Sequence, residues 1–353
     1  KVQFETEKYF REHWNLAEGE SKVVDIFHDM SELTILTASR CLHGDDVRQH
    51  IFTDLHRLYH DLDAGLTPLT TLWRYAPTQN HKRRDEARKE LVVLFDKVIK
   101  ERRLHPDRTD GTDILSLFMD IKYKDGSKIT SDQITGLLIA LLFAGQHTSC
   151  ITSTWAILYL VHNTDYLKRV NEEQEKLGVR HGKKKEDDLL QDVKLDLGVV
   201  NEMELLHNSM REVLRLCPTF TMLLRKALKD VTVTADGKTY VIPKGDIVGV
   251  SPTVSMRLDS TFKDADKFDP DRYGPGREEH KEPYAYLGFG GGMHSCMGQS
   301  FAYMQVKTIM SVLFANYELT PVAKTLPSIN YNAMVVAPDG DCRVRITRKK
   351  VSK

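Results

Sequence analysis

A glycine-rich loop around a single cysteine constrains this chain more than any other feature of its sequence. Residues 289–298 read Phe-Gly-Gly-Gly-Met-His-Ser-Cys-Met-Gly, and an apolar helical pattern over residues 301–314 follows directly. Glycine allows backbone amides to approach the sulfur of Cys296 closely, where side chains would obstruct them. Those amides and the dipole of the following helix stabilise a thiolate, the axial ligand that favours O–O cleavage at haem iron. A buried structural cysteine behind a turn is the alternative.

The bulk composition excludes several classes of protein. The 353 residues carry 50 basic and 50 acidic side chains, so no global positive charge indicates nucleic-acid binding. The five cysteines form no C-x-x-C pair and are odd in number, which suits a reducing compartment rather than a disulfide framework. We therefore expect no nucleic-acid partner.

Apolar periodicity predicts helices over most of the first 220 residues and strands thereafter. Helical runs cover residues 27–42, 51–62, 83–103 and 201–216, while 66–77 and 178–188 read as connections. Thr130-Ser-Asp-Gln133 has the form of a capping box and predicts a helix of about thirty residues. Residues 231–242 alternate around an Asp-Gly turn, which predicts a hairpin, and further strands are expected at 247–250 and near Val335 and Val344. The sequence thus predicts one mainly α domain with small β-sheets over residues 1–353.

The long predicted helix contains the only candidate membrane span, Ile134 to Val161. Four polar residues, at positions 146–149, lie at its centre. A buried helix with a polar stripe fits this pattern better than a membrane span does, so we expect no transmembrane segment in this chain.

Two further motifs have both a structural and a functional interpretation. Glu212 and Arg215 form the only E-x-x-R pair, which by itself is an ordinary helical ion pair. Inside the long helix stands Ala144-Gly-Gln-His147-Thr148-Ser. Gly145 costs about 1 kcal/mol relative to alanine there, which indicates a close approach to a ligand. The hydroxyl of Thr148 could help deliver protons for O–O cleavage, or it could bond back to its own helix.

Together these motifs, in this order, resemble the cytochromes P-450. The amino-acid sequence within and around them is similar to that of the sterol 14α-demethylase family. Most cytochromes P-450 have an acid where this chain has His147. The resemblance is carried by the motif at 144–149 and by the segments 32–44, 301–308 and 330–335. It covers essentially the whole chain and implies the cytochrome P-450 fold.

The resemblance also implies roles for individual residues. Cys296 would ligate the iron of haem b, with Phe289, Gly292, Gly298, Ala144 and Gly145 forming the cofactor site and His294 and Arg225 pairing with haem propionates. Thr148 and His147 would be the catalytic residues. Arg272, in Phe-Asp-Pro-Asp-Arg, would join Glu212 and Arg215 in a supporting network. Phe220, Met222, Leu224 and Met334 would line the sterol cavity, although ordinary core packing explains apolar residues equally well.

The implied activity is oxidative removal of the 14α-methyl group of a sterol precursor, using O2 and electrons from an NADPH-cytochrome P-450 reductase. Azole-type inhibitors and an endoplasmic reticulum membrane are expected for the full-length protein. The family's N-terminal part is missing from this chain, so the fold is expected to be incomplete and the fragment inactive by itself. Another cytochrome P-450 hydroxylase and a catalytically silent haem-binding fragment are the alternatives.

Overall fold

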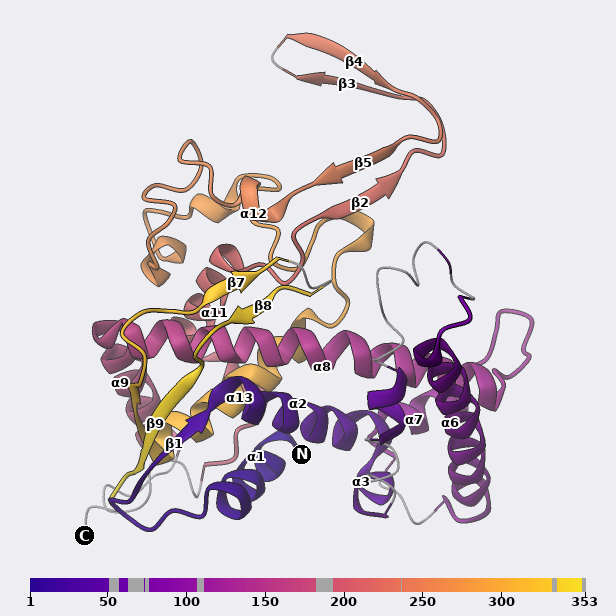
Figure 1. Ribbon diagram of the computed structural model, residues 1–353, viewed down its shortest axis with the longest axis horizontal. Helices are drawn as coiled ribbons and strands as arrows, with labels where there is room; N and C mark the ends of the chain where they lie inside the picture. Colours follow the sequence, from indigo (N-terminus) through magenta and orange to yellow (C-terminus); the bar gives the residue numbers. More distant parts are fainter. Residues whose placement is uncertain are drawn as a thin grey trace. The chain divides into compact units, whose positions relative to one another are not determined.

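The computed structural model describes residues 1–50, 57–62, 73, 76–106, 111–181, 193–235, 237–331 and 335–350. The chain divides into two compact units, residues 1–15 with 31–147 and residues 16–30 with 148–353. Helices predominate in both units (Figure 1). That a single cytochrome P-450 domain comprises both units remains a prediction.

The first unit is helical. Its elements are α1 (Val2–Tyr9), the π-helical turn η1 (Phe10–Trp14), most of α2 (Ile26–His43), α3 (Asp45–His50), α6 (Gln79–Leu104), α7 (Ile114–Asp120) and the first half of α8 (Ser131–His162). Helix α6 begins four residues before the predicted start because Thr78 caps it, accepting from the amide of His81 at 3.2 Å. Residues 57–62 are helical as predicted, whereas 51–56 and most of the predicted connection 66–77 lie outside the described residues.

A buried ionic cluster holds the helices of the first unit together beside an apolar core. Arg102 donates to Asp113 at 2.8 Å and to Asp46 at 2.6 and 3.0 Å, and it also bonds the backbone oxygen of His43. Its side chain is 4% exposed and that of Asp113 is fully buried, so solvent hardly screens this pair. His43 is buried among the same helices, and burial lowers its pKa to about 3.

The second unit combines helices with four small antiparallel sheets. Its helices are the second half of α8, α9 (Thr164–Arg180), α10 (Leu197–Asn201), α11 (Glu204–Leu216), α12 (Pro252–Ser255), α13 (Gln299–Asn316) and the 3-10 turns η3 (Pro270–Tyr273), η4 (Glu279–Lys281) and η5 (Gly292–His294). Its strands are β1 (Ser21–Asp25), β2 (Leu223–Lys226), β3 (Val231–Ala235), β4 (Lys238–Ile242), β5 (Ile247–Val250), β6 (Tyr317–Pro321), β7 (Ser328–Asn330), β8 (Ala337–Asp339) and β9 (Arg343–Arg348).

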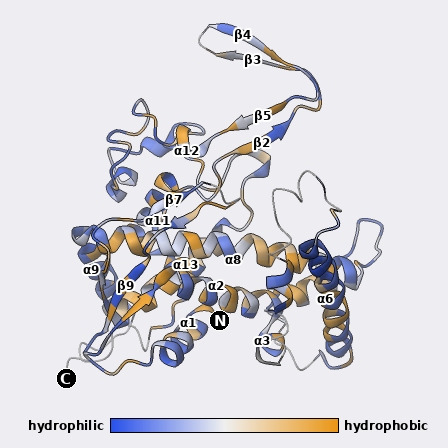
Figure 2. Ribbon diagram, in the orientation of Figure 1, coloured by the Kyte–Doolittle hydropathy of each residue, from blue (hydrophilic) through white to orange (hydrophobic). Residues whose placement is uncertain are grey.

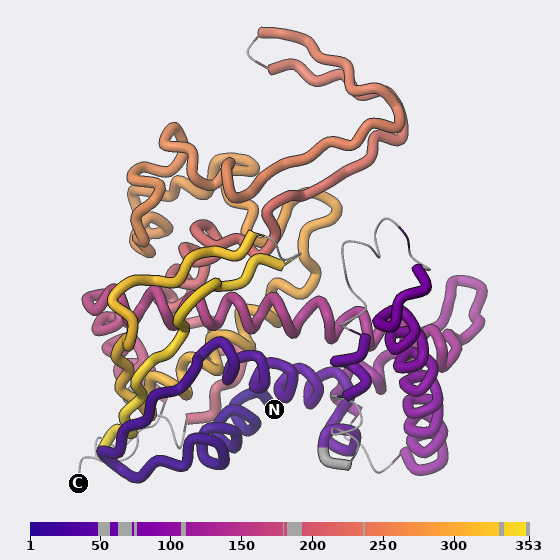
Figure 3. The backbone as a smooth tube through the Cα atoms, in the orientation of Figure 1, coloured from indigo at the N-terminus to yellow at the C-terminus, as the bar shows by residue number. Residues whose placement is uncertain are grey.

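The sheet pairings combine local hairpins with one pairing that spans the chain. The predicted hairpin is β3–β4, and the strand predicted at 247–250 is β5, which pairs with β2. The three-stranded sheet has the order β1-β9-β6, so strand 21–25 lies against strand 343–348. Figure 3 shows these early and late segments side by side. Nothing local in the sequence predicted β1, because its partner lies more than three hundred residues away.

Helix α8 begins at the predicted capping box. The Thr130 hydroxyl accepts from the Gln133 amide at 3.3 Å, and the Gln133 side chain accepts from the Thr130 amide at 2.9 Å. Figure 2 shows hydrophobic residues along much of its length. Among the described residues α8 alone is long and apolar enough to cross a membrane by those two criteria. Residues 149–158 are buried without interruption, which is how the core helix of a folded domain satisfies the same criteria.

Candidate functional site

The cysteine loop is a short, folded turn between two ordered segments. The amide of Cys296 donates to the backbone oxygen of Phe289 at 2.9 Å, which closes the loop across seven residues. Gly290 and Gly292 have φ of +70° and +69°, a conformation that strains any residue with a Cβ. Helix α13 begins at Gln299, three residues after Cys296, so its N-terminus lies next to the thiol-bearing loop as the sequence predicted.

The loop presents a surface that nothing in the described chain covers. Residues 292–300 are all exposed, and the apolar side chains of Met293 and Met297 are 96% and 99% exposed. A Cβ added at Gly292 would have no described atom within 4 Å. An exposed thiol, flanked by apolar side chains and by open space above a glycine, fits a large flat apolar group such as haem. His294, also exposed, lies in the same loop.

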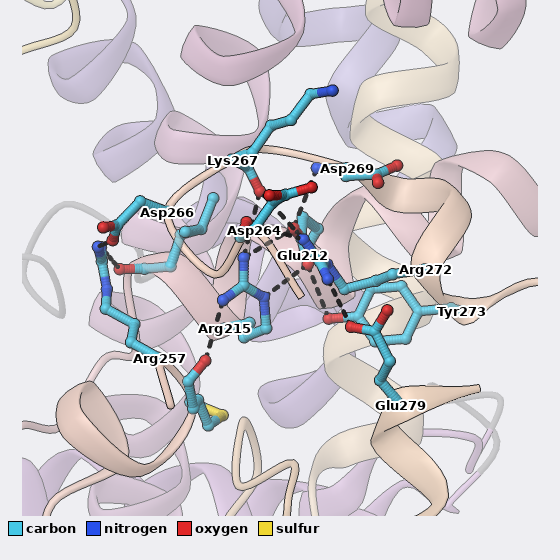
Figure 4. Close-up of polar contacts among 12 residues, drawn as sticks. Glu212, Arg215, Arg257, Asp264, Asp266, Lys267, Asp269, Arg272, Tyr273 and Glu279 are labelled. Atoms are coloured by element: carbon cyan, nitrogen blue, oxygen red, sulfur yellow. Dashed lines mark hydrogen bonds and ion pairs between the residues drawn. The ribbon is translucent and has the colours of Figure 1, made fainter. Parts of the chain in front are cut away.

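A fully buried ionic network is centred on Glu212 of α11 (Figure 4). Arg215, one helical turn further along α11, donates to both carboxylate oxygens of Glu212 at 2.8 and 2.9 Å. Arg272 of η3 donates to the same carboxylate at 2.9 Å. All three side chains are 0% exposed. The structure thus brings together the three residues that the sequence placed in one network.

The two arginines also donate to fixed acceptors outside the Glu212 carboxylate. Arg215 donates to the backbone oxygens of Met256 and Lys267, and Arg272 donates to that of Lys263 at 3.0 Å and to the carboxylate of Glu279 at 2.6 Å. Tyr273 completes the carboxylate shell of Glu212, donating from its hydroxyl at 3.0 Å, and burial raises the pKa of that hydroxyl well above its usual value. Such a densely bonded network is rigid, because its buried polar groups cannot move without losing partners.

The polar motif of the long helix lies within regular α-helix. Ala144, Gly145 and His147 belong to the first unit and Thr148 to the second. A Cβ added at Gly145 would meet nothing within 4 Å among the described residues, so the space beside this turn is open. The carbonyl of Thr148 accepts a back-bond from the Thr152 hydroxyl at 2.7 Å, while Thr148 itself is half-buried.

The residues predicted to line an apolar cavity lie on and before strand β2. Phe220, Met222 and Leu224 are 41%, 49% and 57% exposed. Arg225, next in the strand, is also exposed, and its guanidinium donates to the carbonyl of Leu224. Met334 lies outside the described residues. The amide of Val336, two residues later, donates to the Thr219 carbonyl at 2.9 Å, so this part of the chain returns to the start of the apolar segment.

Sequence reasoning missed a group of aromatic contacts between α11 and the cysteine loop. Tyr303 packs against Phe289 at 5.0 Å and against His207 at 4.2 Å, measured between ring centroids. The guanidinium of Arg211 lies over Tyr286 at 5.3 Å. Positions 207 and 211 are four residues apart on the helix of the E-x-x-R pair. That spacing could have predicted that both side chains lie on one face of the helix.

Comparison with known families gives one extensive match. A sequence model of the family described as Cytochrome P-450 matches residues 5–344. Two solved cytochrome P-450 structures, a retinoic acid-bound cyanobacterial protein and a cytochrome P-450 haem domain, match with a TM-score of 0.81. They are 23% and 22% identical to this chain, cover 98% and 99% of it and match over 73% of their own chains, which establishes likeness of fold.

Several curated relatives are considerably more similar in sequence. A sterol 14-demethylase from Arabidopsis thaliana is 46% identical over 99% of this chain and 68% of its own length. An obtusifoliol 14-alpha demethylase from Sorghum bicolor is 44% identical over 98% of this chain and 68% of its own. The lanosterol 14-alpha demethylase of Homo sapiens is 37% identical over 96% of this chain and 62% of its own. Each relative therefore extends beyond the part that this chain matches.

Proposed function

Because this chain belongs to the sterol 14-demethylase family of the cytochromes P-450 and has their fold, we propose that it removes the 14α-methyl group of a sterol as a haem-thiolate monooxygenase. The single observation that supports this most strongly is 46% identity to a sterol 14-demethylase over 99% of the chain. The exposed thiol of Cys296 in a closed, glycine-lined loop agrees with it.

The cofactor of the family is haem iron ligated by a thiolate, and we assign haem b. Bound haem would supply the oxygen chemistry. Cys296 would hold it on one face, and Gly292 and Gly298 would keep that face free of side chains. His294 and Arg225 would pair with its propionates, because charge-assisted bonds fix orientation as well as affinity. The exposed surface of the loop supports this assignment.

The chain's own part in oxygen activation is to hold and move protons. Thr148 has a hydroxyl, which can pass a proton from solvent toward the site where oxygen is reduced. His147 precedes it and carries the second polar group of that turn. Ala144 and Gly145, a turn earlier, would keep the approach to the cofactor free of bulk, in agreement with the open space beside Gly145.

The substrate side is apolar. Phe220, Met222 and Leu224 would line the sterol cavity with Met334, and their partial exposure in this chain supports contact with another apolar body. We propose an NADPH-cytochrome P-450 reductase as the electron donor and azole-type heterocycles as inhibitors that ligate the iron. An endoplasmic reticulum membrane is the proposed location.

The decisive experiment is a ligand titration of the haem-loaded protein, including any segment that its gene encodes before Lys1. Lanosterol and obtusifoliol should displace the iron's water ligand and shift its spin state, and reductase with NADPH should convert them to 14-desmethyl products. The matched controls are the corresponding 14-desmethyl sterols, which should not be consumed. A protein that oxidises fatty acids and ignores both sterols would be assigned to another cytochrome P-450 activity.

A further inference from the structure

Besides Glu212 and Arg215, helix α11 carries a second pair of residues, and these pack against aromatic side chains on either side of the cysteine loop. His207 and Arg211 are four residues apart and so lie on one side of the helix. We propose that these two residues clamp both ends of the cysteine loop, and that they act as positioning residues for Cys296 through Tyr303 and Tyr286. The proposal rests on the proposed function only in taking Cys296 as the iron ligand.

The first arm of this clamp holds the segment after the cysteine. Tyr303 lies on α13, seven residues beyond Cys296, and is 9% exposed. Its ring is tilted against the imidazole of His207 at 4.2 Å and against the ring of Phe289 at 5.0 Å. The backbone oxygen of Phe289 accepts a hydrogen bond from the amide of Cys296. Tyr303 therefore joins α11 to the residue whose carbonyl closes the loop.

The second arm holds the segment before the cysteine. The Arg211 guanidinium lies between two rings, 4.3 Å from that of Tyr273 and 5.3 Å from that of Tyr286. Tyr286 meets Tyr273 edge to face at 6.0 Å, and its hydroxyl folds over Gly288, where an added Cβ would stand only 2.3 Å away. Tyr286 is thus fixed three residues before Phe289, at the other end of the loop.

The two arms connect the loop to the rigid network. Arg211 precedes Glu212 in the chain, and Tyr273, which Arg211 covers, donates to the Glu212 carboxylate. Burial and nearby Lys307 and Arg211 lower the pKa of His207 to about 4, so its ring is neutral at physiological pH and packs as an aromatic group. Burial raises the pKa of Tyr303 to about 12, so its phenol is also neutral.

Backbone hydrogen exchange tests the clamp without any enzymatic readout, using the protein with any segment that its gene encodes before Lys1. The reporters are the amides of Cys296 and Gly290, which are bonded to the carbonyls of Phe289 and Leu287. Y303L and R211Q should each accelerate their exchange by about tenfold or more, because the loop opens when an aromatic or cation–π contact is lost. Y303F and R211K keep the ring and the cation and should stay within about twofold of wild type.

The control for general loss of stability is F314L, which removes a buried aromatic ring from the same helix, α13. It should leave the Cys296 amide unchanged at temperatures where all variants keep wild-type circular dichroism. The clamp is refuted if the Cys296 amide exchanges at the wild-type rate in Y303L and R211Q, or if F314L accelerates it as much as Y303L does.

Haem binding then separates this proposal from the proposed function. With haem loaded, Y303L should release it to a scavenging apoprotein about tenfold faster than Y303F, and a larger share of its reduced, CO-bound form should lack the thiolate absorption band. If C296S binds haem and gives the same band as wild type, the proposed function fails. If C296S loses the band while Y303L and Y303F behave alike, the clamp alone fails.

Discussion

Arg272 donates its Nε hydrogen to Oε1 of Glu212 at 2.9 Å across sixty residues of sequence, and both side chains are fully buried. The carboxylate is shared with Arg215 and Tyr273, so one acid satisfies donors from α11 and η3 together. Because this acid has no access to water, removing one of its charged partners leaves buried charge that is less well compensated.

Removal of either arginine should therefore be costly. We expect R272A to lower the free energy of unfolding by about 3–5 kcal/mol, since Glu212 keeps its charge and loses a partner. R343A is the control, because that arginine is paired with Asp341 at the exposed start of β9 and its loss should cost well under about 1 kcal/mol. Denaturant unfolding of both variants measures the difference, and equal losses would contradict the assigned role of the network.

Substitution of the proposed iron ligand should change the spectrum and leave the fold intact. C296H should abolish the red-shifted Soret band of the reduced, CO-bound protein, because an imidazole replaces the thiolate. Cys296 is exposed, so little core packing is lost. C41S serves as the matched cysteine control and should retain the band. An unchanged band in C296H would eliminate Cys296 as the ligand.

The Thr148 hydroxyl should affect how much product forms for each NADPH consumed (the coupling of the reaction) rather than the folding of the chain. We expect T148A to bind haem normally but to form several-fold less product for each NADPH consumed, because protons reach the reacting oxygen less productively. T152A removes a hydroxyl one turn later whose bond to the Thr148 carbonyl is purely local, so it should couple normally. Product and NADPH are measured together, and wild-type coupling in T148A would make its hydroxyl structural.

The pH dependence of the free energy of unfolding should show the effect of burying His43. Burial lowers its folded pKa to about 3, below the unfolded value of 6.5, so below pH 6.5 the unfolded chain binds the proton that the folded chain excludes. The stability associated with neutral His43 is therefore fully present above pH 6.5. As pH falls from 6.5 toward 3 the free energy of unfolding decreases, by roughly 1–2 kcal/mol at pH 5. H43Q should flatten this part of the curve. A wild-type slope in H43Q would assign the acid sensitivity to other groups.

The 353-residue chain by itself should form no demethylated sterol. The described residues proposed to line the cavity, Phe220, Met222 and Leu224, are about half exposed in this chain. An open cavity admits water and loses the enclosure that oxygen chemistry needs. Expressed with reductase, haem and both sterols, this chain should give no 14-desmethyl product. Demethylation by the soluble, monomeric chain would show that the enclosure is already present.

The sequence predicted those parts of the structure whose signals are local. The capping box at Thr130 and Gln133 and the hairpin at 231–242 were predicted correctly, because each depends on residues a few positions apart. The E-x-x-R pair required the resemblance to identify Arg272 as its third member. The aromatic contacts of Tyr286 and Tyr303 could not be predicted, because tyrosine in a buried pattern does not indicate which ring it meets.

The order of strands in the three-stranded sheet bears on how the chain is made. Strand β9, the last of the described strands to leave the ribosome, lies between β1 and β6 and pairs with both. During synthesis β1 consequently has no partner in this sheet until more than three hundred further residues have been made, whereas β6 ends at Pro321, shortly before β9 begins at Arg343. A nascent chain that stops before Arg343 leaves β1 and β6 without the strand that joins them, and unpaired strand edges of this kind favour aggregation until that strand is made.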